Sequence, residues 1–252
     1  MSVLSKQSII ELMDKSDLII DGDKKNVGAA YYELRMGTEY YDLTEGVSAI
    51  QLSFNQKVII KPGHRVVLIT KEKLNLPNNL IARVISKGSL FSIGLSAVST
   101  NADPGFSGNL GLVVQNFSDK YIELPQNEGI GKVDFSYLDE CSISPYVGQH
   151  GYQTKTWPIK TQFQKNFNEV KNDSRVFTES DEAHKVLPAI VSASLIKIEG
   201  QQRKINIGLV FFLFINFFLL IAVNTKLFEP IVGLTVNLLT SLFVWLFMKF
   251  SK

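Results

Sequence analysis

The chain has 252 residues, of which 45% are hydrophobic and 20% charged, and this composition excludes a disordered or low-complexity polypeptide. A net charge of +2 gives no reason to expect a nucleic-acid partner. The single cysteine, Cys141, excludes an internal disulfide framework, and with three scattered histidines it cannot form a Cys/His zinc cage. We therefore expect no metal ligands among the protein side chains.

The first part of the chain predicts a compact β-rich domain. Ser8 and Glu11 fit a capping box that opens a short helix over residues 9–15. Short strand-forming runs separated by Gly, Pro, Asn and Asp turns follow at residues 58–60, 65–70, 80–85, 110–117 and 121–124. Many short strands with regular turns are typical of a barrel or jelly roll.

The chain then becomes polar, and residues 161–204 are interpreted as a linker. Its last part, residues 183–202, has a mixed composition that is compatible with a helix lying at a membrane surface. The β domain is accordingly assigned to residues 1–160.

Two uncharged runs of 19 residues complete the chain. The first begins at Ile205 and ends at Val223, and the second begins at Pro230 and ends at Met248. A helix of this length covers about 28 Å, close to the hydrocarbon thickness of a bilayer. Since only six residues join the runs, they predict an antiparallel transmembrane hairpin, with a buried soluble hairpin as the alternative.

Flanking charge predicts the orientation of this hairpin. Arg203 and Lys204 precede the first run, and Lys249 and Lys252 follow the second. The positive-inside rule therefore places both termini and the β domain in the cytoplasm of a multi-pass protein, which we assign to a bacterial inner membrane. Polar residues within the runs, such as Asn216 and Asn237, favour packing of the hairpin on itself over a pore or an oligomer seam.

Six motifs in the β domain occur in an order and at a spacing that resemble one family. They are VGAAYYELRMG at 27–37, PG at 62–63 followed by VVLIT at 66–70 and LP at 76–77, KGSLFSIGL at 87–95, DPGFSG at 103–108, IGKVDF at 130–135, and GYQ at 151–153 before Pro158. This pattern is similar to that of the dCTP deaminase/dUTPase superfamily. The resemblance covers residues 1–160.

The resemblance implies a distorted β jelly roll that assembles as a homotrimer or a higher homo-oligomer. It implies active sites at subunit interfaces that bind a deoxynucleoside triphosphate together with Mg²⁺, without an intrinsic cofactor or zinc. Carried over motif by motif, it predicts these nucleotide-binding residues: Arg35, Lys87, Gly88, Ser89, Ser92, Asn101, Asp103, Gln115, Tyr152, Gln153 and Lys155.

The chain departs from the family at the catalytic position. Hydrolytic deamination needs an acid–base group beside the cytosine ring. The family has a glutamate there, where this sequence has Val113. The aspartate of the dUTPase branch corresponds to Ser99, Thr100 or Asn101, all uncharged, which leaves Asp103 as the fallback. The segment between Gly94 and Asp103 is also two residues shorter than is usual in the deaminases.

Three functions remain open. The first is a membrane-anchored, catalytically inactive nucleotide sensor that reads a deoxynucleotide or a cyclic nucleotide and disrupts the membrane in bacterial antiviral defence. The second is an active, tethered dCTP deaminase or dUTPase of pyrimidine deoxynucleotide metabolism. The third is an oligomeric membrane scaffold. Without a base at Val113, the sequence favours the sensor, a pseudoenzyme, over an enzyme.

Overall fold

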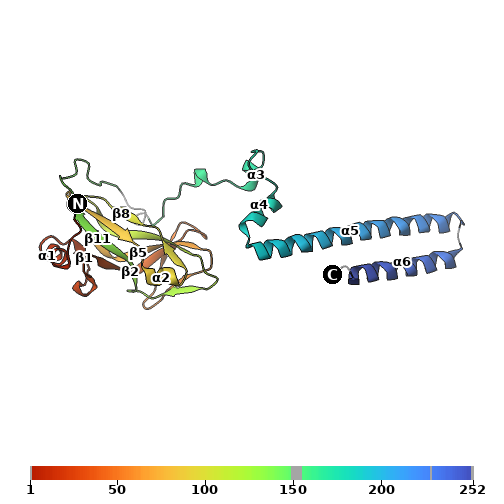
Figure 1. Ribbon diagram of the computed structural model, residues 1–252, viewed down its shortest axis with the longest axis horizontal. Helices are drawn as coiled ribbons and strands as arrows, with labels where there is room; N and C mark the ends of the chain where they lie inside the picture. Colours follow the sequence, from red (N-terminus) through yellow and green to blue (C-terminus); the bar gives the residue numbers. More distant parts are fainter. Residues whose placement is uncertain (1, 149–154, 228, 251–252) are drawn as a thin grey trace. The chain divides into compact units, whose positions relative to one another are not determined.

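The computed structural model describes residues 2–148, 155–227 and 229–250, and the chain divides into two compact units at residue 161. The first unit holds a β domain and the second holds the C-terminal helices (Figure 1). The predicted β-rich class with an N-terminal helix and C-terminal helices is confirmed.

The N-terminal helix α1 (Lys6–Ser16) begins earlier than the sequence predicted. Its N-cap is Ser5, whose hydroxyl accepts a hydrogen bond from the Ser8 backbone N–H at 3.3 Å. The predicted capping box at Ser8 is therefore wrong by one turn, because Ser5 offers the same hydroxyl at a position where the backbone is still extended. The helix buries Ile9 against the sheet.

A curled antiparallel sheet forms the body of the domain, with strand order β7-β9-β5-β2-β11-β6-β8. This path is open at both ends among the described residues, so the sheet is a curled half-barrel and not the closed barrel that the sequence allowed. Its strands are β2 (Tyr32–Asp42), β5 (Arg65–Asn75), β6 (Leu80–Ile85), β7 (Leu95–Ala97), β8 (Thr100–Ala102), β9 (Ser107–Asn116) and β11 (Gly129–Tyr137).

Shorter elements complete the domain. Strands β1 (Ile19–Ile20) and β3 (Ala49–Gln51) pair with β5 and β2, and β4 (Val58–Ile60) pairs with β10 (Ile122–Leu124) in a separate ribbon. The 3₁₀ helix η1 (Lys24–Asn26) and helix α2 (Gly88–Ser92) lie in connections. All five predicted strand runs overlap observed strands, and the runs at 110–117 and 121–124 each extend one residue beyond theirs. Strands β2 and β11 were identified only as motifs.

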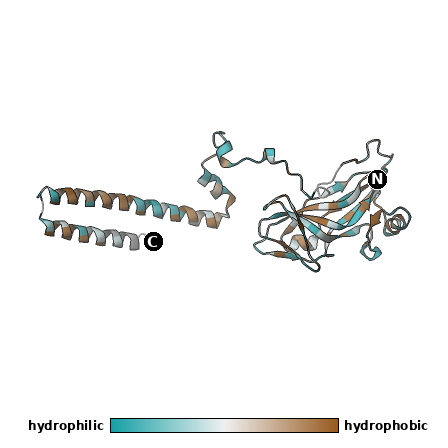
Figure 2. Ribbon diagram, turned by 180° about the vertical axis from the view of Figure 1, so that it is seen from behind, coloured by the Kyte–Doolittle hydropathy of each residue, from teal (hydrophilic) through white to brown (hydrophobic). Residues whose placement is uncertain are grey.

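The core lies on the concave side of the sheet, and its composition follows from strand periodicity. Along β9, Leu110, Leu112 and Val114 alternate with more exposed residues, and each is at most 5% exposed. Figure 2 shows the same alternation of hydrophobic and hydrophilic residues on other strands. This alternation leaves the opposite face of β2, β5 and β9 for other uses.

The second unit contains the 3₁₀ helix η3 (Thr161–Phe163, its first residue in the first unit) and the helices α3 (Phe167–Val170), α4 (Glu179–Val186), α5 (Ala189–Asn224) and α6 (Pro230–Phe250). The segment expected to be a linker thus carries short helices. A break at Pro188 separates α4 from α5. The expected surface helix is not a separate element, because α5 runs without interruption into the first apolar run.

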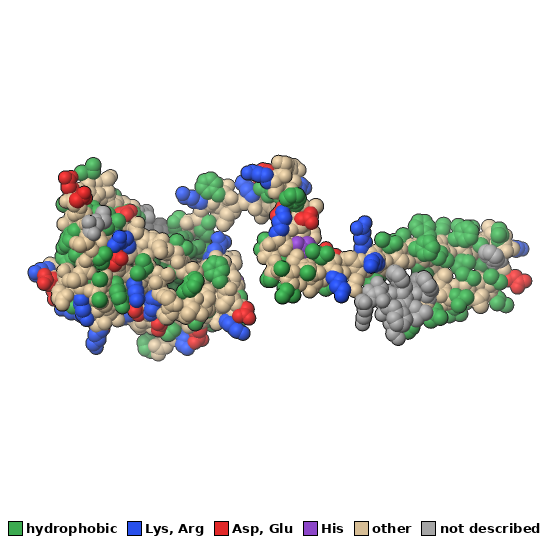
Figure 3. Space-filling view, in the orientation of Figure 1, with side chains coloured by type: hydrophobic (Ala, Val, Ile, Leu, Met, Phe, Trp, Pro, Cys, Tyr) green, Lys and Arg blue, Asp and Glu red, His purple; other side chains and the backbone are tan. Residues whose placement is uncertain are grey.

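Helices α5 and α6 lie side by side and antiparallel (Figures 1 and 2). They approach closely at Gly233, where a Cβ would lie 2.7 Å from Val223 Cγ2. By length and composition α5 can cross a membrane, while the described apolar stretch of α6, Pro230–Leu242, is shorter. Figure 3 shows hydrophobic side chains gathered along both helices, with Lys and Arg on the first part of α5.

Candidate functional site

The convex face of the sheet carries a second, smaller apolar cluster. Tyr41 on β2 is the register partner of Val67 on β5, which in turn pairs with Val113 on β9. Tyr41 and Val67 are fully buried although they point away from the main core. Another part of the chain must therefore cover this face. Val113, the position that the family resemblance assigns to catalysis, lies on this face.

The cover is a short arm from the end of the domain, residues 155–157. Thr156 forms a β-bridge with Ser48, and the Trp157 backbone N–H donates to Val47 O at 2.9 Å. The centroid of the Trp157 ring lies 5.7 Å from that of the Tyr41 ring, and Trp157 and Val113 both pack against the cluster of Tyr41, Val67 and Ile69. The arm thus adds an edge to the sheet and places an indole over the apolar cluster.

A cavity of about 270 Å³ opens beside this indole. It is lined by Val98, Ser99, Thr100, Asn101, Phe106, Asn109, Leu110, Gly111, Val113 and Trp157. The structure therefore brings Val113 together with Ser99, Thr100 and Asn101, the three residues predicted to correspond to the dUTPase aspartate. None of these described lining residues is ionisable, so this cavity can bind a neutral ring through amides and hydroxyls but offers no general base.

A second cavity, of about 260 Å³, shares Asn109 with the first and contains a carboxylate. Glu39 has a side chain only 10% exposed, accepts a hydrogen bond from the Tyr41 hydroxyl at 2.8 Å and forms an ion pair with Lys155. Burial and the neighbouring Glu39 raise the pKa of Tyr41 well above its ordinary value, so the phenol stays protonated and donates. Glu39 is the one acid lining either cavity among the described residues.

Arg35, predicted to contact phosphate, is instead engaged inside the domain. Its Nε donates to Glu72 Oε1 at 2.5 Å, and its backbone N–H donates to Glu72 Oε2 at 2.8 Å. The Tyr32 hydroxyl also donates to Glu72 at 3.2 Å. Burial lowers the pKa of Arg35, but bonding to Glu72 outweighs it, and the net shift is upward. Within one chain this guanidinium serves the fold.

The remaining predicted residues are dispersed. Lys87 pairs with Glu33 at 3.0 Å, and Ser92 in α2 donates to the Ser89 carbonyl at 2.7 Å. Asp103 lies in a turn, where its carbonyl oxygen accepts a hydrogen bond from the Phe106 backbone N–H at 3.0 Å. Gly88 begins α2, and Gln115 lies in β9 between Arg65 and Ser96. Tyr152 and Gln153 lie outside the described residues. These nucleotide contacts stay predictions.

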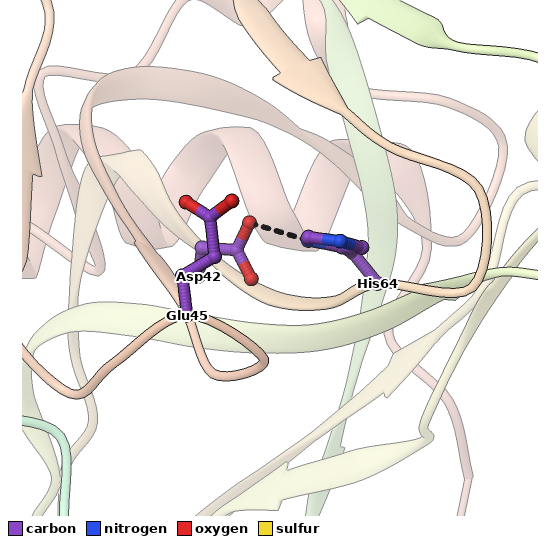
Figure 4. Close-up of side chains that lie close together, drawn as sticks. All are labelled: Asp42, Glu45 and His64. Carbon is purple, nitrogen blue, oxygen red and sulfur yellow. Dashed lines mark hydrogen bonds and ion pairs between the residues drawn. The ribbon is translucent and has the colours of Figure 1, made fainter.

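One cluster has the composition of a cation site. Figure 4 shows Asp42, Glu45 and His64 close together, with ligand atoms within 4.8 Å of one another. The Asp42 carboxylate bonds His64 Nδ1 at 2.8 Å and accepts from the Thr44 backbone N–H at 3.0 Å, while Glu45 is paired with Lys61. Every member already has a partner, so we assign the cluster to fixing the turn after β2.

Sequence reasoning missed Glu39, Tyr41, Gly111 and Trp157. Only Gly111 had a local signal, because a glycine inside a strand marks a bulge or a close backbone approach. The others are joined by contacts over long sequence separations, such as the 116 residues between Glu39 and Lys155.

Comparisons with known proteins agree with the motif pattern. The dUMP-forming dCTP deaminase of Methanosphaera stadtmanae is 24% identical over 191 residues, which is 67% of this chain and 97% of the relative. The dCTP deaminase of Pyrococcus horikoshii is 28% identical over 141 residues, 56% of this chain and 88% of the relative. The solved structure of the 2'-deoxycytidine 5'-triphosphate deaminase from Agrobacterium tumefaciens has a TM-score of 0.47 at 18% identity, over 54% of this chain and 49% of that one.

The family profile described as dCTP deaminase-like matches residues 3–138, which is more than half of the chain and includes every strand of the sheet. The chain therefore belongs to the dCTP deaminase-like family.

Proposed function

We propose that this chain is a membrane-tethered enzyme of the dCTP deaminase type that acts on a pyrimidine deoxynucleoside triphosphate at the convex face of the sheet. The observation that carries this is the pair of adjoining cavities, one with uncharged described lining residues and one lined by Glu39 and two lysines, in a chain whose named relatives are dCTP deaminases. The relatives support an enzyme better than a sensor without turnover.

The two cavities are suited to different parts of such a substrate, the first to its base and the second to its anionic group. Asn101, Ser99 and Thr100 line the neutral cavity and provide donors and acceptors for an uncharged heterocycle. Lys71 lines the second cavity beside Glu39 and supplies positive charge for an anionic group. Mg²⁺ would arrive with the triphosphate, since the neutral cavity has no carboxylate among its described lining residues.

Glu39 is the proposed acid–base group in place of Val113. In the deamination of dCTP, the oxygen of one water attacks C4 of the cytosine ring while Glu39 accepts a proton from that water. The same carboxyl then protonates the leaving amine, so that dCTP and water give dUTP and ammonia. Tyr41 positions Glu39 through its hydroxyl.

The test uses the full-length protein in detergent with Mg²⁺ and either dCTP or dUTP. Products are separated by chromatography and identified by mass. We expect dUTP, or dUMP with pyrophosphate, from the wild type and a loss of at least about 100-fold in Glu39→Gln, the usual contribution of a general base. Glu45→Gln, an exposed acid just beyond β2, is the matched control and should keep full activity. Unchanged substrate with wild-type protein would refute the enzyme.

A second candidate, a nucleotide-binding sensor without turnover, is favoured by one observation. Val113 and Trp157 line the same cavity, and none of its described lining residues is an acid or a base. If dCTP binds to the wild type but is recovered unchanged, the sensor replaces the enzyme. If no nucleotide binds at all, the oligomeric scaffold remains.

The membrane tether is a separate part of the proposal. It is supported by the 36-residue length and apolar second half of α5 and by the packing of α6 against it. Expressed full-length protein should float with membranes and resist extraction at high pH, whereas a chain ending at residue 165 should stay in the soluble fraction. Release of the full-length protein by alkaline carbonate would refute the tether.

A further inference from the structure

The Trp157 ring lies against the backbone of Gly111, which has no side chain there. We call this position the Gly111 seat. A Cβ on Gly111 would lie 2.6 Å from Trp157 Cζ3 and closer still to Cη2, as well as 2.9 Å from Val67 Cγ1. Carbon atoms do not approach this closely, so any other residue at position 111 would move the indole. Glycine weakens a strand interior, and its use here corresponds to the close approach of the arm.

The arm is fixed by contacts of different strength. Trp157 packs on the cluster of Tyr41, Val67 and Ile69. The backbone of residues 155–157 pairs with residues 47–49, and Lys155 forms an ion pair with Glu39. Lys155 has a φ of +57°, a left-handed conformation that is unfavourable for a residue other than glycine. The contacts of residues 155–157 therefore offset the unfavourable backbone conformation of Lys155.

The seated indole obstructs the site. It forms a wall of the neutral cavity, and the cavity's 270 Å³ lies just below the range of about 300–1,000 Å³ typical of ligand pockets. Val113 lines the same cavity. A nucleotide base that enters this cavity beside position 113 would therefore meet the indole that forms its wall.

We propose that Trp157 is a removable plug: a nucleotide entering the convex face displaces the arm of residues 155–157 from the Gly111 seat. This rests on the proposed function only in placing the nucleotide at that face. Because Trp157 lies four residues before the boundary between the two units at Thr161, displacement also frees the start of the segment that leads to α5. Ligand binding at the sheet is thereby linked to the chain that precedes the helices.

The seat itself is tested without ligand. The chain has two tryptophans, so Trp245→Phe leaves Trp157 as the only indole fluorophore. In that background of the full-length protein, Trp157 emission should be blue-shifted and protected from acrylamide. Gly111→Val, which keeps the indole but fills its seat, should red-shift the emission and at least double the quenching constant. Protection that is unchanged in Gly111→Val would overturn the seat.

The plug is tested by titration with dCTP and Mg²⁺, with dCTP binding followed by equilibrium dialysis. Wild-type Trp157 should become exposed to acrylamide as dCTP saturates the protein. Removing the plug in Trp157→Ala should tighten binding about tenfold, as expected when a competent state populated at roughly one-tenth becomes the dominant one. Phe163→Ala removes an exposed aromatic ring six residues further on and should leave binding unchanged.

The outcomes separate this proposal from the proposed function. Weaker binding by Trp157→Ala, with an unchanged melting temperature, would make the indole a ligand contact and overturn the plug. Gly111→Val then serves as the second variant, because it should tighten binding even if Trp157→Ala unfolds the domain. Binding that appears only in the plug variants would support the plug. If neither the wild type nor the variants bind dCTP, the plug and the proposed function both fail.

Discussion

Two buried carboxylates of the β domain, Glu72 and Glu39, have the same kinds of partner and different surroundings. Each accepts a hydrogen bond from a tyrosine hydroxyl, Tyr32 for Glu72 and Tyr41 for Glu39, and each is paired with a cation. Glu72 is completely buried and its Arg35 partner is 17% exposed, whereas the Lys155 partner of Glu39 is 64% exposed.

The difference separates a structural site from an adaptable one. Arg35 and Glu72 belong to neighbouring strands of the sheet, and the carboxylate accepts both a side-chain and a backbone donor from Arg35. Lys155 reaches Glu39 from a short arm beyond the last strand, and it can leave without breaking a strand pairing of β2. Glu39 can therefore lose its ion pair with Lys155 while β2 stays paired. For this reason Glu39 is a better candidate than Glu72 for an acid–base role.

The largest effect is expected for Glu72→Gln. This change leaves the Arg35 guanidinium buried without its counter-charge and should lower the free energy of unfolding by about 3–5 kcal/mol. Urea unfolding followed by Trp157 fluorescence in the Trp245→Phe background measures the loss. The double variant Arg35→Met, Glu72→Leu should recover most of it, and a single variant as stable as the wild type would remove the distinction between the two sites.

Tyr41→Phe should have the next largest effect. It deletes a hydroxyl that donates to a buried carboxylate, which is worth about 1.5–3 kcal/mol for a hydrogen bond to a charged group. Tyr40→Phe, on the opposite face of β2, is the control and should cost less. Equal losses in the two variants, measured by the same urea unfolding, would show that the Glu39 site is not specifically stabilised by Tyr41.

The same phenol predicts the alkaline limit of stability. Because the folded domain raises the pKa of Tyr41 above its ordinary value of 10.0, the folded state retains a proton that the unfolded chain loses above that pH. This contribution is fully present below pH 10 and declines as the pH rises further. The free energy of unfolding should therefore be lower above pH 10 than at pH 9, and this decrease should be smaller in Tyr41→Phe. An identical pH dependence in both proteins would contradict the assignment.

The smallest effect is expected for Lys155→Gln. An ion pair with an exposed partner contributes about 0–1 kcal/mol, and salt screens it over roughly 8 Å at physiological ionic strength. The loss should be below about 1 kcal/mol and should disappear at 1 M NaCl. A loss as large as that of Glu72→Gln would place Lys155 in the fold instead of on a removable arm.

Particular residues show how far sequence reasoning reached. The strand runs at 58–60 and 80–85 coincide with β4 and β6, because their turns and β-branched residues are local signals. The cap of α1 was misplaced because Ser5 and Ser8 offer the same hydroxyl one turn apart. Arg35 was interpreted as a phosphate contact because its motif does not reveal that Glu72, 37 residues away, holds it.

The sequence by itself determined the β-rich domain, the family motifs and the apolar runs of α5 and α6, because each depends on residues close together in the chain. It also determined that position 113 carries no acid. Only the tertiary structure decided that Glu39 lines the cavity adjoining that of Val113, and that Trp157 lines the Val113 cavity. Both depend on strand register, which sets Gly111 opposite Ile69, and on an arm that returns to the sheet at Ser48.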